Sequence, residues 1–107
     1  MNLNKIKDAL LTVTDNVGHY TVMRETDQYI VWAEDSQADA VWADDTMQAQ
    51  AIQGTIDYFT KTENDLNAEK IQTALNNADI SFYLNSVQYE DETKFIHYEW
   101  VWSLWPG

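Results

Sequence analysis

The side chains that could perform acid–base or metal chemistry are few and widely separated in this sequence. His19 and His97 are its only histidines, and it has no cysteine. No pair of ligands has the spacing of a zinc site, which needs about four Cys, His or carboxylate ligands. His97 and Glu99 lie two residues apart and would share one side of a strand, so they could form an acid–base pair. A partly exposed cross-strand contact of His97 is the simpler interpretation, and we favour it.

The carboxylates do not follow a cation-binding pattern either. A calcium loop alternates oxygen ligands around a glycine and ends in a glutamate within twelve residues, and neither 35–45 nor 57–69 fits that pattern. The glycines are Gly18, Gly54 and Gly107, which leaves no glycine-rich loop to hold a phosphate. No Ser-His-Asp arrangement can be singled out. We therefore expect no enzyme activity, no metal and no cofactor.

The charge balance constrains the partners of the protein. Six Lys and Arg against eighteen Asp and Glu give a net charge of −12. This balance argues against binding to a nucleic-acid backbone or to an anionic membrane, since both need a basic surface. The plainest interpretation is an acidic protein that repels its own copies. A more specific interpretation is that acid is concentrated where DNA must pass or where a basic partner docks.

Targeting and redox signals are weak. The lack of cysteine fits a reducing cytosol. Lys5, Lys7 and Asp8 interrupt the N-terminal apolar residues, so we expect no signal peptide. No apolar run is long enough to cross a bilayer, and we expect no membrane partner.

The first third of the chain predicts a helix and two strands. Apolar residues recur every three or four positions from Leu3 to Val17, which predicts an amphipathic helix over about 2–16. A short strand over 19–23 and a buried strand over 28–33 follow, separated by a polar turn. We expect these two strands to form a hairpin.

The segment 34–50 is unusual. It contains five carboxylates and no basic residue, proline or glycine. Long excursions in small domains are usually functional or disordered, and we expect an extended hairpin with Trp42 near its tip. The candidate lumen or partner-docking residues are the acids of this segment and its tryptophan: Glu34, Asp35, Asp39, Trp42, Asp44 and Asp45.

The remainder predicts strand, helix, strand, strand. A strand over 51–61 alternates apolar and polar residues, and a helix over about 67–77 has Asp65 or Asn67 as its cap. Two strands over 80–90 and 94–104 form a hairpin that turns at 91–93. Alternation places Tyr98, Trp100 and Trp102 on one face of the last strand, which calls for a helix-covered sheet face.

These elements predict one α+β domain over 1–107, with an antiparallel or mixed sheet of about four to five strands and both helices on one face. The expected core is apolar and drawn from every element: Leu10, Val13, Ile30, Ile56, Ile71, Leu75, Phe82, Ile96, Tyr98, Trp100 and Trp102. A ligand-stacking role for Trp100 and Trp102 is the less favoured alternative. Trp42 and Trp105 are nearly as well suited to an interface as to the core.

Several segments together resemble a known family. They are the strand 54–61 (GTIDYFTK), the helix 70–75 (KIQTAL), the hairpin 87–100 and the N-terminal helix followed by Tyr29–Trp32 (YIVW). In this arrangement, over nearly its whole length, the chain resembles the tail-completion or tail-terminator proteins of long-tailed (siphovirus-type) bacteriophages and prophages. The shared motifs are structural rather than catalytic.

The resemblance implies a virion structural protein that assembles in the bacterial cytoplasm. Such a subunit forms a ring, expected to be a hexamer, on the head-proximal end of the tail tube, where it stops tube polymerisation. Its partners would be the tail-tube protein, the head–tail connector protein and other copies of itself. DNA would pass through the ring without being bound specifically. The alternative is an acidic DNA mimic that inhibits a host nuclease or another basic DNA-binding protein, and a small enzyme ranks third.

Overall fold

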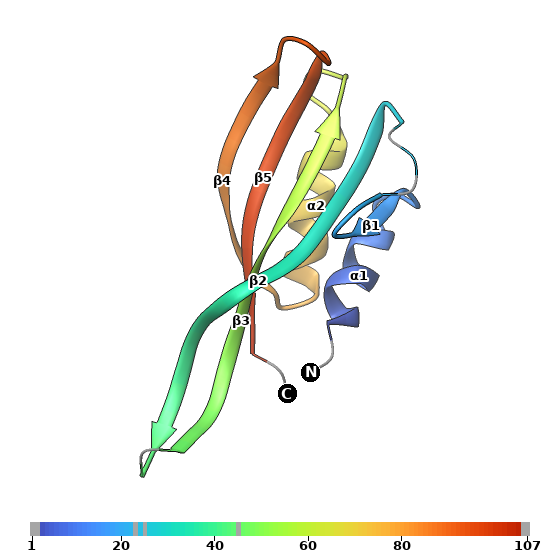
Figure 1. Ribbon diagram of the computed structural model, residues 1–107. Coiled ribbons are helices and arrows are strands. Elements are labelled where there is room, and N and C mark those ends of the chain that lie inside the picture. Colours follow the sequence, from blue (N-terminus) through green and yellow to red (C-terminus); the bar gives the residue numbers. More distant parts are fainter. Residues whose placement is uncertain (1–2, 23, 25, 45, 106–107) are drawn as a thin grey trace.

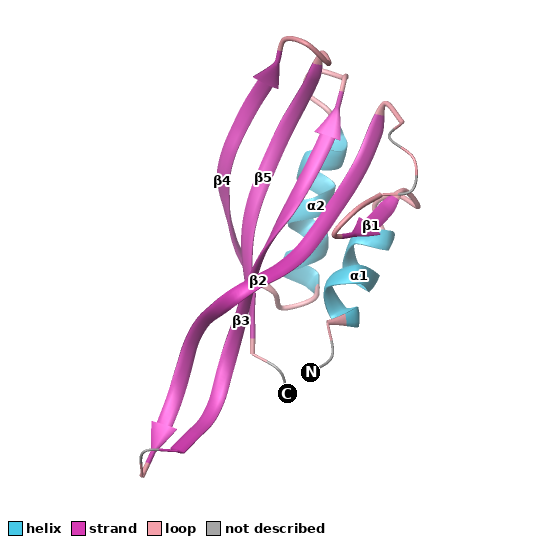
Figure 2. Cartoon of the chain, in the orientation of Figure 1, coloured by secondary structure: helices cyan, strands magenta, loops and turns pink. Residues whose placement is uncertain are grey.

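The protein is described by a computed structural model that covers residues 3–22, 24, 26–44 and 46–105 (Figure 1). It has two helices and five strands (Figure 2). In chain order they are α1 (Asn4–Leu11), β1 (Val17–His19), β2 (Gln28–Ala43), β3 (Thr46–Thr60), α2 (Leu66–Asn77), β4 (Ser81–Glu90) and β5 (Phe95–Leu104). The molecule is elongated, 52 × 25 × 24 Å, because β2 and β3 run far beyond the other strands.

The strands form one mixed sheet in the order β1-β2-β3-β5-β4, and both helices lie on one of its faces. The predicted fold class is therefore confirmed. The predicted early hairpin is wrong, because β1 pairs with β2 in parallel, with Val17 opposite Ile30. The chain leaves β1 through Tyr20, whose φ is +69°, and returns around a loop before it enters β2. A parallel pair needs such a return connection, whereas a hairpin needs only a turn.

Helix α1 ends at Leu11 rather than near residue 16. The Thr12 hydroxyl donates to the Ala9 carbonyl oxygen at 2.6 Å, and the Thr12 N–H reaches the same oxygen. The β-branched Val13 and Thr14 follow, which disfavour helix continuation. The apolar periodicity persists past the helix because Val13 and Val17 still pack against the core from irregular chain and β1.

Asp65 caps α2 and also joins it to the sheet. Its Oδ1 accepts the N–H of Asn67 at 2.9 Å, which is an ordinary N-cap. Its Oδ2 accepts hydrogen bonds from the hydroxyls of Tyr58 and Thr60, both at 2.6 Å, and from the Gln28 amide at 2.9 Å. Burial, followed by the bond to Asp65, raises the pKa of Tyr58 to about 12, so this hydroxyl remains a donor.

The core lies between the helices and the sheet. Seven of the predicted core residues are buried: Leu10, Ile30, Ile56, Ile71, Leu75, Trp100 and Trp102. Val13, Phe82 and Tyr98 are partly buried against them. Ile96 is only half-buried, because it pairs with Thr60 at the end of the sheet, where the chain turns towards α2. Trp100 and Trp102 have hydrogen-bonded ring N–H groups, Trp100 with Gln72 and Trp102 with the Thr55 carbonyl oxygen.

Aromatic rings stack on the face opposite the helices. Tyr29 stacks on Phe59 at a centroid distance of 4.7 Å, and Phe59 stacks on His97 at 4.3 Å. Phe95 meets Tyr29 and Phe59 edge-on. Tyr29 and Phe95 are consequently buried although both helices lie on the other face. Stacked rings of this kind stabilise a sheet beyond the area that they bury.

Gly54 is expected to tolerate no side chain. A Cβ at this position would collide with the backbone oxygen of Ala33 and lie 2.6 Å from Cζ2 of Trp102. We predict that Gly54→Ala lowers the free energy of unfolding by about 2–3 kcal/mol, since a packed core admits extra atoms only by straining its neighbours. Urea denaturation would measure the change. In a Trp102→Phe background, Gly54→Ala should still lower the free energy of unfolding, though by less, because the contact with the Ala33 backbone persists.

Candidate functional site: an acidic arm on a helix-backed sheet

The segment 34–50 forms a two-stranded arm that projects from the sheet (Figures 1 and 2). β1 pairs with β2 only as far as Trp32, and β5 pairs with β3 only from Ile52. The expected extended hairpin is therefore confirmed. Extra residues in β2 at Asp35 and Ala38 shift the register where the arm leaves the sheet. Such bulges bend a strand and increase its twist, which accounts for the changed direction of the arm.

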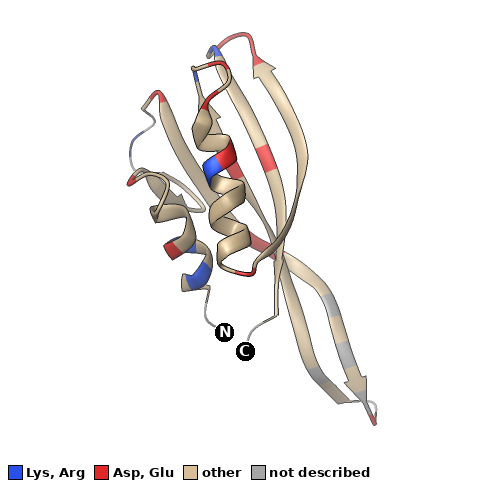
Figure 3. Ribbon diagram, turned by 180° about the vertical axis from the view of Figure 1, so that it is seen from behind, with Lys and Arg blue, Asp and Glu red and all other residues tan. Residues whose placement is uncertain are grey.

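The arm carries negative charge only. No Lys or Arg occurs between Arg24 and Lys61, and Figure 3 shows basic residues on the helices and at the far end of the sheet, with none on the arm. Asp35 is exposed, as is Asp44, which adopts a positive φ of 51° in the turn. Trp42, next to that turn, is 60% exposed. The Asp39 side chain and Asp45 lie outside the described residues.

The Glu34 carboxylate is held by residues from outside the arm, whereas the Asp35 carboxylate accepts from the neighbouring Ser36 hydroxyl at 2.9 Å. Glu34 accepts from His19 Nε2 at 2.8 Å and from the Tyr20 hydroxyl. Burial raises the pKa of Glu34, but the hydrogen bonds from Tyr20 and His19 outweigh burial and lower the pKa overall. The His19 ring also stacks on Trp32 with its centroid 3.9 Å away. This cluster ties the root of the arm to the last residue of β1 and to Tyr20 after it.

His97 makes the expected cross-strand contact, but its partner is Asp57 rather than Glu99. His97 Nε2 lies 2.7 Å from Asp57 Oδ1, and Nδ1 lies 3.9 Å from Glu90 Oε2. The hydrogen bond to Asp57 raises the pKa of His97, and the charges of Glu90 and Glu99 add to that effect against burial. The group stabilises β3 against β5.

Because its pKa is raised, His97 makes the stability of the fold depend on pH in a definite direction. Because the folded-state pKa is above the unfolded value, the stabilisation by His97 is complete below about pH 6.5 and is lost as the pH rises through the folded-state value. We predict that His97→Gln costs roughly 0.5–1 kcal/mol at pH 5.5 and less at pH 8.5. Urea denaturation at both values measures this difference, with Asp57→Asn expected to behave in the same way. An equal cost at both values would contradict the ion pair.

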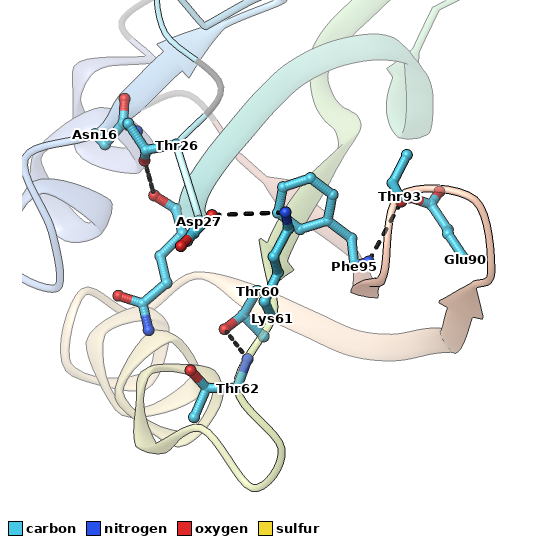
Figure 4. A network of polar contacts seen from close by, with 10 residues as sticks. Asn16, Thr26, Asp27, Thr60, Lys61, Thr62, Glu90, Thr93 and Phe95 are labelled. Carbon is cyan, nitrogen blue, oxygen red and sulfur yellow. Dashed lines mark hydrogen bonds and ion pairs between the residues drawn. The ribbon is translucent and has the colours of Figure 1, made fainter.

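The end of the sheet opposite the arm is tied by a polar network (Figure 4). The Lys61 ammonium lies 3.7 Å from Asp27 and 4.9 Å from the centroid of the Phe95 ring. In the β4–β5 turn, the Thr93 hydroxyl donates to Glu90, and the Phe95 N–H donates to Thr93. Lys61 thus links the ends of β2, β3 and β5, and the Thr93 contacts hold the turn between β4 and β5.

The described part of the chain contains no group of three or more His, Asp or Glu residues that could hold a metal ion. Within the same residues, no helix is long and apolar enough to cross a membrane. The surface hollows are open grooves. One of about 370 Å³ lies between α2 and β4 and is lined by Leu66, Leu84 and Trp100, among others.

Comparison with known proteins finds a structural likeness. No protein-family model and no curated protein sequence matches the chain. One solved structure that does match is described as "Virion of native gene transfer agent (GTA) particle". The chain shares its fold with a chain of that particle. The TM-score is 0.59 at 12% sequence identity, and the match covers 92% of this chain and 88% of the other.

Sequence reasoning found the acids of the arm but not their different surroundings. Asp35 and Asp44 are exposed, whereas Glu34 is bonded to His19, fifteen positions earlier. That pair depends on the parallel β1–β2 register, which places His19 opposite Trp32. The only signal in the sequence is a histidine at the first position of the predicted short strand 19–23.

Proposed function

We propose that the protein is a virion structural protein, a tail terminator that closes the head-proximal end of the tail tube as a ring. In this role it stops tube polymerisation and joins the tail to the head connector. The shared fold with a chain of a gene transfer agent particle supports the proposal. The resemblance of several sequence segments to tail-terminator proteins supports it independently.

The observation that carries the proposal is the all-acidic arm. In a ring, arms from successive subunits would line the passage, with Asp35 and Asp44 exposed towards DNA. Carboxylates repel phosphates, so DNA could slide past without being retained, whereas lysines would bind it. Trp42 at the arm tip and Trp105 after β5, 60% and 47% exposed, suit contacts with the tail-tube and connector proteins.

Localisation in the particle tests the proposal. The experiment uses an epitope-tagged chain expressed in induced cells, with purification of particles, immunogold labelling and mass spectrometry of proteins that copurify. We expect gold at the head–tail junction, together with tail-tube and connector proteins. Particles from an untagged strain are the control. Gold at the distal tip, absence from particles, or copurification of a host nuclease instead would contradict the proposal, and the last result would favour the DNA mimic.

A further inference from the structure

β4 is an edge strand with little of the usual protection against pairing. It is the last strand in the sheet order, so one side of its backbone faces away from β5. From Ile80 to Tyr89 it carries no charged residue and no proline. Natural edge strands are normally protected by lysine, proline, bulges or short length, and β4 has only one register shift, between Leu84 and Ser86.

The opposite edge of the sheet is protected. β1 covers three positions of β2, and the outer edge of β2 beyond them belongs to the arm. There it contains the extra residues Asp35 and Ala38 and the acids Glu34, Asp35 and Asp39. Bulges and charges prevent a regular strand from pairing. The contrast between the two edges indicates that β4 is the edge adapted to receive a strand.

Exposed apolar side chains lie between the β4 edge and α2. Leu84, Val87 and Tyr89 pair with Trp100, Tyr98 and Ile96, so they lie on the helix-covered face, yet they are 44%, 50% and 58% exposed. Leu66, at the start of α2, is 64% exposed across the adjoining groove. A strand added beside β4 would place alternate side chains over this groove.

The charges around β4 indicate what kind of strand fits. The uncharged stretch lies between Asp79 and the turn acids Glu90, Asp91 and Glu92, with Lys94 as the only base in that turn. In the register centred on Asn85, antiparallel pairing of two β4 strands would bring Asp79 of one copy near Asp91 of the other, just beyond the ends of the paired strands, where like charges repel. Since the other edge is also protected, strand pairing between copies of this chain is disfavoured at both edges.

We propose that the β4 edge is the docking site for an extended segment of a different protein, uncharged and alternately apolar, with basic residues immediately before it. Antiparallel addition, the more stable arrangement, brings the N-terminus of that segment beside Glu90–Glu92. This docking proposal rests on the proposed function only for the expectation that the partner belongs to the same particle. Binding at the edge can be tested without any particle, so the two proposals can fail separately.

The test uses a synthetic peptide of alternating threonine and valine with two N-terminal lysines. One control peptide has two glutamates in their place, and another has the lysines at the C-terminus. Amide hydrogen exchange and NMR shifts of the full chain are followed through a titration to millimolar peptide. We expect slower exchange confined to β4 and roughly tenfold weaker binding of the glutamate peptide, in line with two exposed charge pairs.

Variants of the chain make the test specific. Val87→Lys should abolish binding of the lysine peptide, while Leu11→Lys, at an exposed apolar position on α1, should leave it unchanged. Asp91→Asn with Glu92→Gln should weaken binding of the lysine peptide, but less than exchanging its lysines for glutamates does, because Glu90 remains and no repulsion is added; Asp8→Asn with Asp15→Asn should not weaken it. The proposal is overturned if β4 exchange is unaffected, if the peptides bind equally well, or if β4 becomes protected when the protein alone is concentrated.

Discussion

Replacing Asp65 with alanine is expected to lower the free energy of unfolding by about 3–4 kcal/mol. One carboxylate accepts the Asn67 N–H at the start of α2 and three side-chain bonds from β2 and β3. Loss of the cap costs about 1 kcal/mol, and buried donors left without an acceptor cost about 1–3 kcal/mol. Thr60 is fully buried, so water cannot replace its lost partner. Urea denaturation followed by circular dichroism measures the change.

The Asp65 effect also has a pH signature. Burial raises the pKa of Asp65, but the hydrogen bonds from Thr60, Tyr58 and Asn67 outweigh burial, and the pKa falls below its ordinary value of 3.8. The stabilisation is therefore complete above the unfolded-state value and is lost as the pH falls through the folded-state value. The alanine variant should lack this acid-dependent loss. Glu63→Ala, an exposed change in the same loop, is the control, and a similar cost there would show that loop disturbance is responsible.

In the proposed ring, replacing the two exposed acids of the arm with lysines is expected to impair DNA delivery while particles still assemble. Asp35→Lys with Asp44→Lys would change the net charge of segment 34–50 from −5 to −1, since two acids are lost and two bases gained, and would place two cations on each arm beside the passing phosphates. Several subunits around one passage would multiply these contacts, and we expect delivery to fall on the order of tenfold or more at low salt, with partial recovery at high salt. A transduction or ejection assay on purified particles measures the efficiency of DNA delivery.

Two matched variants separate the lumen role from a general charge effect. Asp35→Asn with Asp44→Asn removes charge without adding any, and should have a much smaller effect. Asp8→Lys on α1 with Asp15→Lys in the segment after it makes the same charge change on the body, away from the arm, and should leave delivery unchanged. Particles that carry the two lysines on each arm and deliver DNA normally would rule out an acidic lumen formed by this segment.

The sequence predicted well wherever a single periodicity extended over a whole element. The alternation from Phe95 to Leu104 set both faces of β5, and the acidic hairpin was expected from the lack of proline and glycine in 34–50. Prediction failed where a partner distant in sequence decides the structure. β1 could be assigned to a hairpin because short strands carry no information about the direction of pairing. The pairing of His97 with Asp57 likewise depends on the β3–β5 register, which sets residues 40 positions apart side by side.

β2 and β3 each pass without interruption from the arm into the body, and this continuity has a mechanical consequence. A pull on the arm tip along the strands would be transmitted directly to the β3–β5 ladder, which runs antiparallel from Ile52 to Thr60. Its hydrogen bonds lie across the direction of that pull, so they would be loaded together in shear rather than broken one after another. The arm can therefore carry tension into the sheet. Under load, we expect the β2–β3 hydrogen bonds to break first at the bulge near Asp35, and those of the β3–β5 ladder later.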